Sequence, residues 1–386
     1  MDIRTKLVFA FIAVTLVSMA AFGWFMYHTA EEMTDAAAVE QLSIWSERVG
    51  VQIVKHAQGA DPGAVAESWR EFFEDYLGGM VEGEKLKAVI VGGGLHGLAA
   101  AYFLARDHGI TDIAVVEKRY IGFGGSGRNT AIVRANQRTQ YNVPLYKEAL
   151  DLWPVLTKEL DFNLMFNNCG NLNLMHSEAA MKAARMTIAT AQFHGVESHL
   201  IDAKEAKELV PALNISEDIT FPIHGAMYHP PGGIVRHDAV VWGLAKGCAK
   251  HGVHIHQQTE ATAIDTEDGK ITGVQTSRGR IRAPRVLVTA GGYSAGLIYH
   301  MLGIKLPIAV LTIQAMVTQP LKPILNHVVS SGAYHAYANQ TLKGEIATGA
   351  HMDPWPNYTT QTTAYYIKHQ AEAITEMLPC LKGVKF

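Results

Sequence analysis

The chain has 386 residues, of which 48% are hydrophobic and 18% charged, and its formal net charge is −3. This length is enough for two domains with sizeable cores, and this composition excludes an intrinsically disordered protein. The slight acidic excess argues against a nucleic-acid-binding protein, which usually carries a basic surface. The three cysteines lie far apart without metal or redox spacing, so we expect reduced structural thiols.

An apolar segment without a charged residue runs from residue 7 to residue 27. It is long enough to cross a bilayer as one helix, with basic residues before it and aromatic residues at its far end. We therefore expect a transmembrane anchor over residues 1–28, a membrane localisation and a cytoplasmic N-terminus, followed by a helical membrane-proximal segment over residues 29–85. A cleaved signal peptide and a buried core helix are the alternatives.

A strand, a glycine turn, a helix and a second strand follow from residue 87. Residues 88–91 and 113–116 are short apolar runs typical of buried parallel strands, and residues 95–107 are rich in alanine and leucine. This order predicts a right-handed βαβ unit.

Further elements alternate between helix and strand. We expect a helix over residues 236–250 with Asp238 at its N-cap, a strand over residues 254–264, a hairpin turn at Asp268-Gly269 and a strand over residues 285–289. Mixed elements of this kind predict an α/β fold with an inserted second domain.

A glycine motif occupies the turn between the first strand and the helix. Gly92, Gly94 and Gly97 spell G-x-G-x-x-G, and Glu117 ends the second strand. The glycines allow a tight turn, a close approach of a pyrophosphate to the main chain and close packing of the helix, whose N-terminus attracts phosphate. Glu117 can accept hydrogen bonds from adenosine ribose hydroxyls. The pattern predicts a dinucleotide site, and a glycine turn without a ligand is the alternative.

Two later segments favour a flavin over a nicotinamide cofactor. Residues 122–130, GFGGSGRNT, can donate hydrogen bonds to a second phosphate face. Ala290, Gly291 and Gly292 follow an apolar strand and allow a second close approach of the main chain to the cofactor.

Five longer passages carry a family resemblance: residues 127–134 (GRNTAIVR), 232–247, 286–295, 306–325 and 344–353. On these passages the chain resembles the D-amino-acid oxidase, glycine oxidase and sarcosine oxidase superfamily, and within it the β subunit of heterotetrameric sarcosine oxidase. The resemblance implies a Rossmann-like FAD-binding domain with an interleaved mixed-sheet substrate domain. The FAD-binding parts would span about residues 86–140 and 232–300, and the substrate domain about residues 141–231 and 301–386.

The resemblance also implies which residues bind the cofactors. Noncovalent FAD would contact Gly92, Gly94, Gly97, Glu117, Lys118, Ser126, Arg128, Asn129, Ala261, Ala290 and Gly291. An FMN would be joined covalently to His237 of an Arg-His-Asp motif, because a neutral imidazole nitrogen can attack the flavin 8α-methyl group. A histidine at the surface start of a helix is the alternative for His237.

The implied reaction is the oxidation of a sarcosine-like N-methyl amino acid by hydride transfer to FAD. Arg134 matches the substrate-binding arginine of the monomeric relatives, and a guanidinium binds a carboxylate bidentately. A structural salt bridge is the alternative for Arg134, and Ala131 stands where those relatives have a neighbouring arginine. Tyr334, His335 and His351 fall in the region that faces the flavins in the family, without an assigned role. The expected partners are the amine substrate, other sarcosine oxidase subunits and the membrane.

Two departures from the family leave other functions open. The apolar N-terminal segment suits a membrane-bound amine dehydrogenase of the same superfamily, or a non-catalytic membrane-anchored protein with a flavin fold. The sequence ends at Phe386, where relatives continue with a further strand and helix, so we expect weak FAD binding or inactivity for this chain alone.

Overall fold

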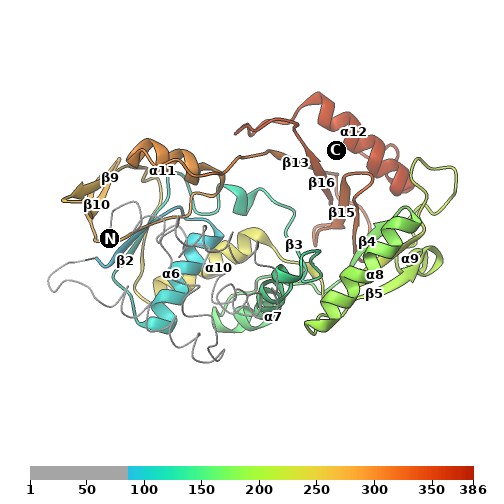
Figure 1. The fold of residues 1–386 in the computed structure, drawn as a ribbon, viewed down its shortest axis with the longest axis horizontal. Coiled ribbons are helices and arrows are strands. Elements are labelled where there is room, and N and C mark those ends of the chain that lie inside the picture. Colours follow the sequence, from blue (N-terminus) through green and yellow to red (C-terminus); the bar gives the residue numbers. More distant parts are fainter. Residues whose placement is uncertain (1–85) are drawn as a thin grey trace, which may run out of the picture. The chain divides into compact units, whose positions relative to one another are not determined.

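The computed structural model describes residues 86–386 (Figure 1). The membrane anchor expected over residues 1–28 and the helical segment expected over residues 29–85 lie outside these residues. Within the described part, no helix is long and apolar enough to cross a membrane. The described chain forms two compact units: the first contains residues 86–128, Thr157–Phe162 and Asp238–Ile308, and the second contains Asn129–Leu156, Asn163–His237 and Ala309–Phe386.

The first unit is built around a four-stranded parallel sheet with the order β12-β1-β2-β8. Val91 of β1 pairs with Val288 of β12 and with Val116 of β2, so the carboxyl ends of these strands meet at one edge of the sheet. β1, β2 and β12 are apolar and fully buried, as strands covered on both faces must be. The strands are β1 (Ala88–Val91), β2 (Ile113–Val116), β8 (His254–His256) and β12 (Val286–Val288).

Helix α6 connects β1 to β2 and buries a face of small and apolar residues that includes Gly97, Leu98 and Ala101. It ends at Gly109, whose left-handed φ of 62° lets its N–H group donate to the Leu104 carbonyl. A three-stranded antiparallel sheet has the order β11-β10-β9. Its residues Ile264 and Val274 share a hydrophobic core with Val288 of β12 and Ile298 of α11. The remaining bounds are α6 (Leu95–His108), η1 (Gly125–Gly127), α10 (His237–Lys250), β9 (Ala261–Glu267), β10 (Lys270–Thr276), β11 (Gly279–Arg282), η3 (Gly291–Tyr293) and α11 (Ser294–Leu302).

Two predicted details of this unit are wrong. Helix α10 begins at His237, so Asp238 lies in its first turn and is not the N-cap. Residues 254–264 do not form one strand: they contain all of β8 and the first residues of β9, and the two strands belong to different sheets. The main chain leaves the extended conformation between them because Gln258 has a left-handed φ of 52° and donates its N–H group to the Arg119 carbonyl.

The second unit contains a seven-stranded mixed sheet with the order β13-β16-β15-β14-β4-β6-β5. Its strand pairs are antiparallel except for β14 and β4. Adjacent residues of β6 point to opposite faces, so Ala226 packs in the core with Ile374 of α12 while Met227 packs with Ile188 of α8. Helices therefore cover both faces of this sheet.

The strands of this unit are β3 (Ile132–Val133), β4 (Asn171–Met175), β5 (His199–Asp202), β6 (Gly225–His229), β7 (Gly233–Ile234), β13 (Ile313–Val317), β14 (Val328–Ser331), β15 (Ala336–Gln340) and β16 (Ile346–Met352). The helices are η2 (Gln140–Asn142), α7 (Val143–Glu159), of which most belongs to this unit, α8 (Glu178–Phe193), α9 (Ala203–Leu209), α12 (Ala364–Met377) and η4 (Pro379–Leu381). The mixed α/β fold expected from the sequence is confirmed. The assignment of a role to each part remains a prediction.

Candidate functional site

The glycine turn of the first unit leaves no room for side chains. Gly92 has a left-handed φ of 118°, and a Cβ atom there would lie 2.7 Å from the Thr289 carbonyl oxygen. A Cβ atom at Gly97 would lie 2.0 Å from the carbonyl oxygen of Gly92, so the helix could not pack against the turn. At Gly94 a Cβ atom would approach the Ser126 Oγ atom to 3.0 Å. Glycine is therefore required at Gly92 and Gly97 for the turn itself to form.

Helix α6 begins directly after this turn with its positive end unneutralised. Its N-cap is Gly94, which offers no side-chain cap, and its first turn holds no acidic residue. The Oγ atom of Ser126 accepts a hydrogen bond of 2.8 Å from the Leu95 N–H group. Since the first N–H groups of a helix lack intrahelical partners, this end of α6 suits a phosphate group.

Glu117 lies at the end of β2 beside the glycine turn. Its two carboxylate oxygens accept hydrogen bonds of 2.9 Å from the N–H groups of Gly93 and Arg119. These bonds hold the carboxylate in place and leave further lone pairs for ribose hydroxyl donors. The glycine turn, the helix N-terminus without an acidic residue and the fixed carboxylate together fit an adenine dinucleotide.

Two further predicted residues and one neighbour lie at the same edge of the sheet. Ala290 and Gly291 follow β12 after Thr289, and Gly291 has a left-handed φ of 57°. Thr289 is not among the residues predicted from the sequence. Its hydroxyl donates to the Gly92 carbonyl at 2.9 Å or to the Val91 carbonyl at 3.1 Å. The one feature of the sequence that could have indicated Thr289 is its position between an apolar strand and Ala290.

The remaining predicted contacts of this unit have protein partners. Ala261 begins β9, and the segment before it is tied to the site because the Thr259 N–H group donates to the Glu117 carbonyl at 2.8 Å. The Lys118 ammonium forms an exposed ion pair of 2.8 Å with Glu260. The Arg128 guanidinium lies 4.3 Å from the ring centroid of Phe123.

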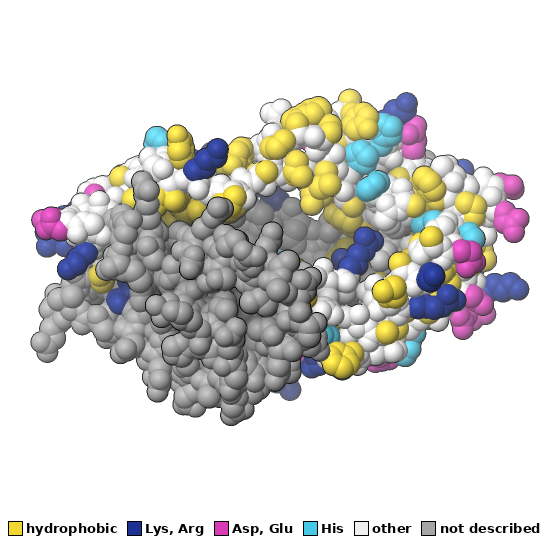
Figure 2. Space-filling model, in the orientation of Figure 1, with side chains coloured by type: hydrophobic (Ala, Val, Ile, Leu, Met, Phe, Trp, Pro, Cys, Tyr) yellow, Lys and Arg dark blue, Asp and Glu magenta, His cyan; other side chains and the backbone are white. Residues whose placement is uncertain are grey.

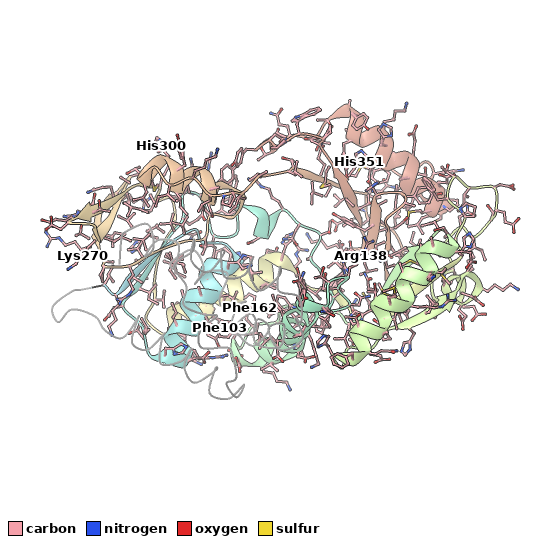
Figure 3. All side chains as sticks on the ribbon, in the orientation of Figure 1. Phe103, Arg138, Phe162, Lys270, His300 and His351 are labelled. Carbon is pink, nitrogen blue, oxygen red and sulfur yellow. The ribbon has the colours of Figure 1, made fainter. Side chains whose placement is uncertain are left out.

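In the second unit, Arg134 follows strand β3 and is half-buried. Burial lowers the pKa of its guanidinium, nearby Tyr146 raises it, and the charge of Arg138, labelled in Figure 3, lowers it again. Within residues 86–386 no carboxylate forms an ion pair with Arg134. A partly desolvated guanidinium without an anionic protein partner is suited to binding an anionic ligand.

Two other predicted residues lie in this unit. Asn129 accepts a hydrogen bond of 2.7 Å from the Ala131 N–H group through its Oδ1 atom, and Ala131 has a left-handed φ of 55°. This local turn precedes β3 and occupies one lone pair of the Asn129 amide. His237 is the half-buried first residue of α10.

A histidine cluster lies on β16, on α12 and just before β15 of the second unit, over which histidines and hydrophobic side chains gather in Figure 2. The His351 and His369 rings stack with centroids 5.7 Å apart. The His335 ring centroid lies 6.3 Å from that of His351, and the Tyr365 ring centroid lies 4.3 Å from that of His369. Burial lowers the pKa of His351, and so do His369 and His335. Within the described residues no set of side chains is arranged to hold a metal ion. Tyr334, by contrast, is a core residue.

The glycine turn, the N-terminus of α6 and Glu117 fit the dinucleotide-binding pattern of a Rossmann-type fold. The sequence model of the family described as FAD dependent oxidoreductase matches residues 87–386, and the chain belongs to this family. Its cofactor is therefore FAD.

Similar proteins of known name indicate which kind of FAD-dependent oxidoreductase this chain resembles. Sarcosine oxidase subunit beta of Rhizobium meliloti is 40% identical over 77% of this chain and 71% of its own length. The protein of the same name from Rhodobacter capsulatus is 36% identical over 78% of this chain and 72% of its own length. Among solved structures, L-proline dehydrogenase from P. horikoshii is 31% identical, with a TM-score of 0.72 over 78% of this chain and 79% of its own. The chain is thus an FAD-dependent oxidoreductase that acts on amines.

Proposed function

We propose that this protein oxidises an N-methyl amino acid such as sarcosine at the carbon next to its secondary amine. The observation that carries the proposal is Arg134, whose half-buried guanidinium forms no ion pair with a carboxylate of residues 86–386. An amino-acid substrate supplies that carboxylate, and the relatives named sarcosine oxidase subunit beta support the N-methyl class.

The residues of the two units have separate tasks. The glycine turn and the N-terminus of α6 would hold the FAD pyrophosphate, and Glu117 would hold the adenosine ribose. Bound FAD supplies the acceptor for the hydride that leaves the substrate carbon. Arg134 would bind the substrate carboxylate bidentately and thereby fix the direction of the amine end. The partial burial of Arg134 strengthens this ion pair because water competes less.

The test combines binding with flavin reduction. Full-length protein is purified, loaded with FAD and mixed with sarcosine without oxygen, and the visible absorbance of the flavin is followed. We expect bleaching that depends on the sarcosine concentration. Absence of bleaching with sarcosine and with other N-methyl amino acids, from protein with stoichiometric FAD, would contradict the proposed substrate class.

A second candidate function concerns the electron acceptor. The likeness to L-proline dehydrogenase favours an amine dehydrogenase, because proline is also a secondary amine and that protein is named a dehydrogenase. The apolar segment over residues 7–27 supports the proposal that such an enzyme is anchored in a membrane. Reoxidation of the reduced protein by a quinone analogue but not by oxygen would support the dehydrogenase, and the reverse result would support the oxidase.

We also propose a covalent FMN at His237 and assembly with other subunits. The support is the Arg236-His237-Asp238 sequence at the start of α10 and the relatives, which are named as a subunit. Acid precipitation tests the attachment: flavin that stays with the wild-type precipitate and is released from His237→Asn would support it. Complete release of flavin from the wild-type protein would contradict it.

A further inference from the structure

His229 is a fully buried histidine at the end of β6, opposite Asn171 of β4. Its Nδ1 atom lies 2.6 Å from the Glu197 carbonyl oxygen, and its Nε2 atom lies 3.1 Å from the main-chain nitrogen of Ala135. The ring therefore connects the segment before β5 to the residue directly after Arg134.

These two partners determine the protonation of the ring. A carbonyl oxygen only accepts, so Nδ1 carries the hydrogen and donates to Glu197. An amide N–H group only donates, so Nε2 carries a lone pair and accepts from Ala135. Burial lowers the pKa of His229; the Glu197 carbonyl raises it, the positive charge of Arg134 lowers it, and the Glu197 carboxylate raises it. The neutral ring satisfies both bonds, whereas a protonated ring would direct Nε2–H at the Ala135 N–H group.

The bond to Ala135 acts directly on Arg134. The Ala135 N–H group belongs to the peptide that joins Arg134 to Ala135, so His229 fixes the orientation of that peptide plane. The carbonyl oxygen of the same peptide lies 3.5 Å from the Nε2 atom of Gln137. Ala135 itself is fully buried and packs with Val143 and Leu150. The main chain of Arg134 is thus held, while its guanidinium carries no carboxylate partner.

We infer that His229 is a positioning residue for substrate binding: its neutral imidazole holds the Arg134 peptide so that the guanidinium is ordered for a carboxylate before the ligand arrives. This inference rests on the proposed function, in which Arg134 binds the substrate carboxylate. Preorganisation of this kind raises affinity because less freedom is lost on binding.

Two substitutions separate the two bonds of the ring. In His229→Gln the amide oxygen can reach the position of Nε2 and accept from Ala135. In His229→Asn the amide nitrogen can reach the position of Nδ1 and donate to Glu197, but no acceptor remains for Ala135. The variants therefore differ in the bond to the Arg134 peptide, and each retains one polar group in the same buried space.

His176 provides a matched control in the same unit. Its Nδ1 atom lies 2.8 Å from the Phe221 carbonyl oxygen and its Nε2 atom lies 2.7 Å from the Ser331 Oγ atom, so it also connects two segments through both ring nitrogens. His176→Asn is expected to lower stability as His229→Asn does, without an effect on ligand affinity.

The readout is the binding of methoxyacetate, which has the shape and carboxylate of sarcosine but no amine to oxidise. Its Kd for the full-length, FAD-loaded protein is measured by calorimetry, with FAD content and thermal unfolding recorded for each variant. We expect His229→Asn to bind methoxyacetate about tenfold more weakly, because it loses one hydrogen bond and leaves a buried donor unpaired. His229→Gln and His176→Asn should bind it nearly as the wild type does. In the wild type we also expect affinity to fall as the pH falls through the lowered pKa of His229, and this acid loss to be absent from His229→Gln.

The possible failures are distinguishable. If Arg134→Met binds methoxyacetate as the wild type does, the proposed role of Arg134 is wrong, and the inference about His229 is overturned with it. If Arg134→Met loses binding but His229→Asn retains wild-type affinity, only the inference about His229 is overturned. Equal losses of affinity in His229→Asn, His229→Gln and His176→Asn would also overturn it, because stability alone would then explain them.

Discussion

In the first unit the candidate ligand site is made mainly of main chain, whereas in the second it is made of one side chain held by residues from distant strands. The proposed FAD site depends on where Gly92 and Gly97 allow the backbone to pass and on the N-terminus of α6. The proposed substrate site depends on Arg134. The peptide that joins it to Ala135 donates to His229, which lies 94 residues further along the chain. A site made of backbone is sensitive to any added atom, and a site made of side chains is sensitive to the loss of one polar group.

The largest expected effect comes from adding one carbon to the backbone site. Gly97→Ala places a Cβ atom 2.0 Å from the Gly92 carbonyl oxygen, a contact that only a shift of α6 can relieve. We expect loss of bound FAD and a destabilisation of about 3 kcal/mol, comparable to severe overpacking. Flavin absorbance per protein and urea unfolding measure the two effects.

Gly296→Ala is the matched control for that change. Gly296 lies in α11, and a Cβ atom there meets nothing within 4 Å. Alanine at an exposed helix position should stabilise the protein by about 0.5–1 kcal/mol, with normal FAD content. If both variants retained FAD equally, the description of the turn as a close-packed cradle would be wrong.

The next effect tests the side-chain site. Arg134→Met keeps most of the side-chain length and removes the charge, so we expect kcat/KM for sarcosine to fall about hundredfold, as for a lost charge-assisted bidentate contact. FAD content should be unchanged, because the proposed FAD contacts do not include Arg134. A fall in FAD content equal to that of Gly97→Ala would remove the contrast between the two sites.

A smaller effect is expected at Thr289, which joins β12 to the glycine turn. Thr289→Val removes the hydroxyl that donates to the Gly92 or Val91 carbonyl while preserving the side-chain shape. We expect FAD to bind more weakly by about 1 kcal/mol, the usual net contribution of one hydrogen bond. Thr289→Ser retains the hydroxyl and should bind FAD like the wild type; titration of the apoprotein with FAD measures both.

The last prediction concerns the effect of pH on folding stability. Burial lowers the pKa values of His176, His229 and His327 below their ordinary value of 6.5. The unfolded chain therefore binds more protons than the folded chain as the pH falls below 6.5, so stability rises with pH and is lost on acidification. Urea unfolding at several pH values should show this slope, and His229→Gln should reduce it. A stability that increased from neutral to acidic pH would contradict the assignment.

The sequence predicts the first unit better because its information is local. Residues 88–116 contain the strand, turn, helix and strand in order, and the observed α6 extends the expected helix by one residue. The single strand predicted over residues 254–264 is wrong, although these residues form one run of strand formers. The left-handed conformation of Gln258 interrupts it, and a hydrogen bond to Arg119 from a distant segment stabilises that conformation.

The second unit illustrates what local sequence does not contain. The parallel pairing of β14 with β4 joins Val328 to Asn171, and no local pattern indicates this neighbour. Likewise, His229 is one of 18 histidines in the chain, and its contact with the Arg134 peptide exists only once β6 is in place. Arg134 itself was found through a family resemblance, not through a physical signal in the sequence.

The bond between Thr289 and the glycine turn has a consequence for biosynthesis. The two partners are separated by 197 residues, and most of the second unit is encoded between them. During synthesis, β1 and the glycine turn therefore emerge from the ribosome long before β12 can pair with them. The glycine turn therefore gains its Thr289 partner only after β12 has emerged, so on the proposed FAD site the cofactor would bind in its final setting only late in synthesis.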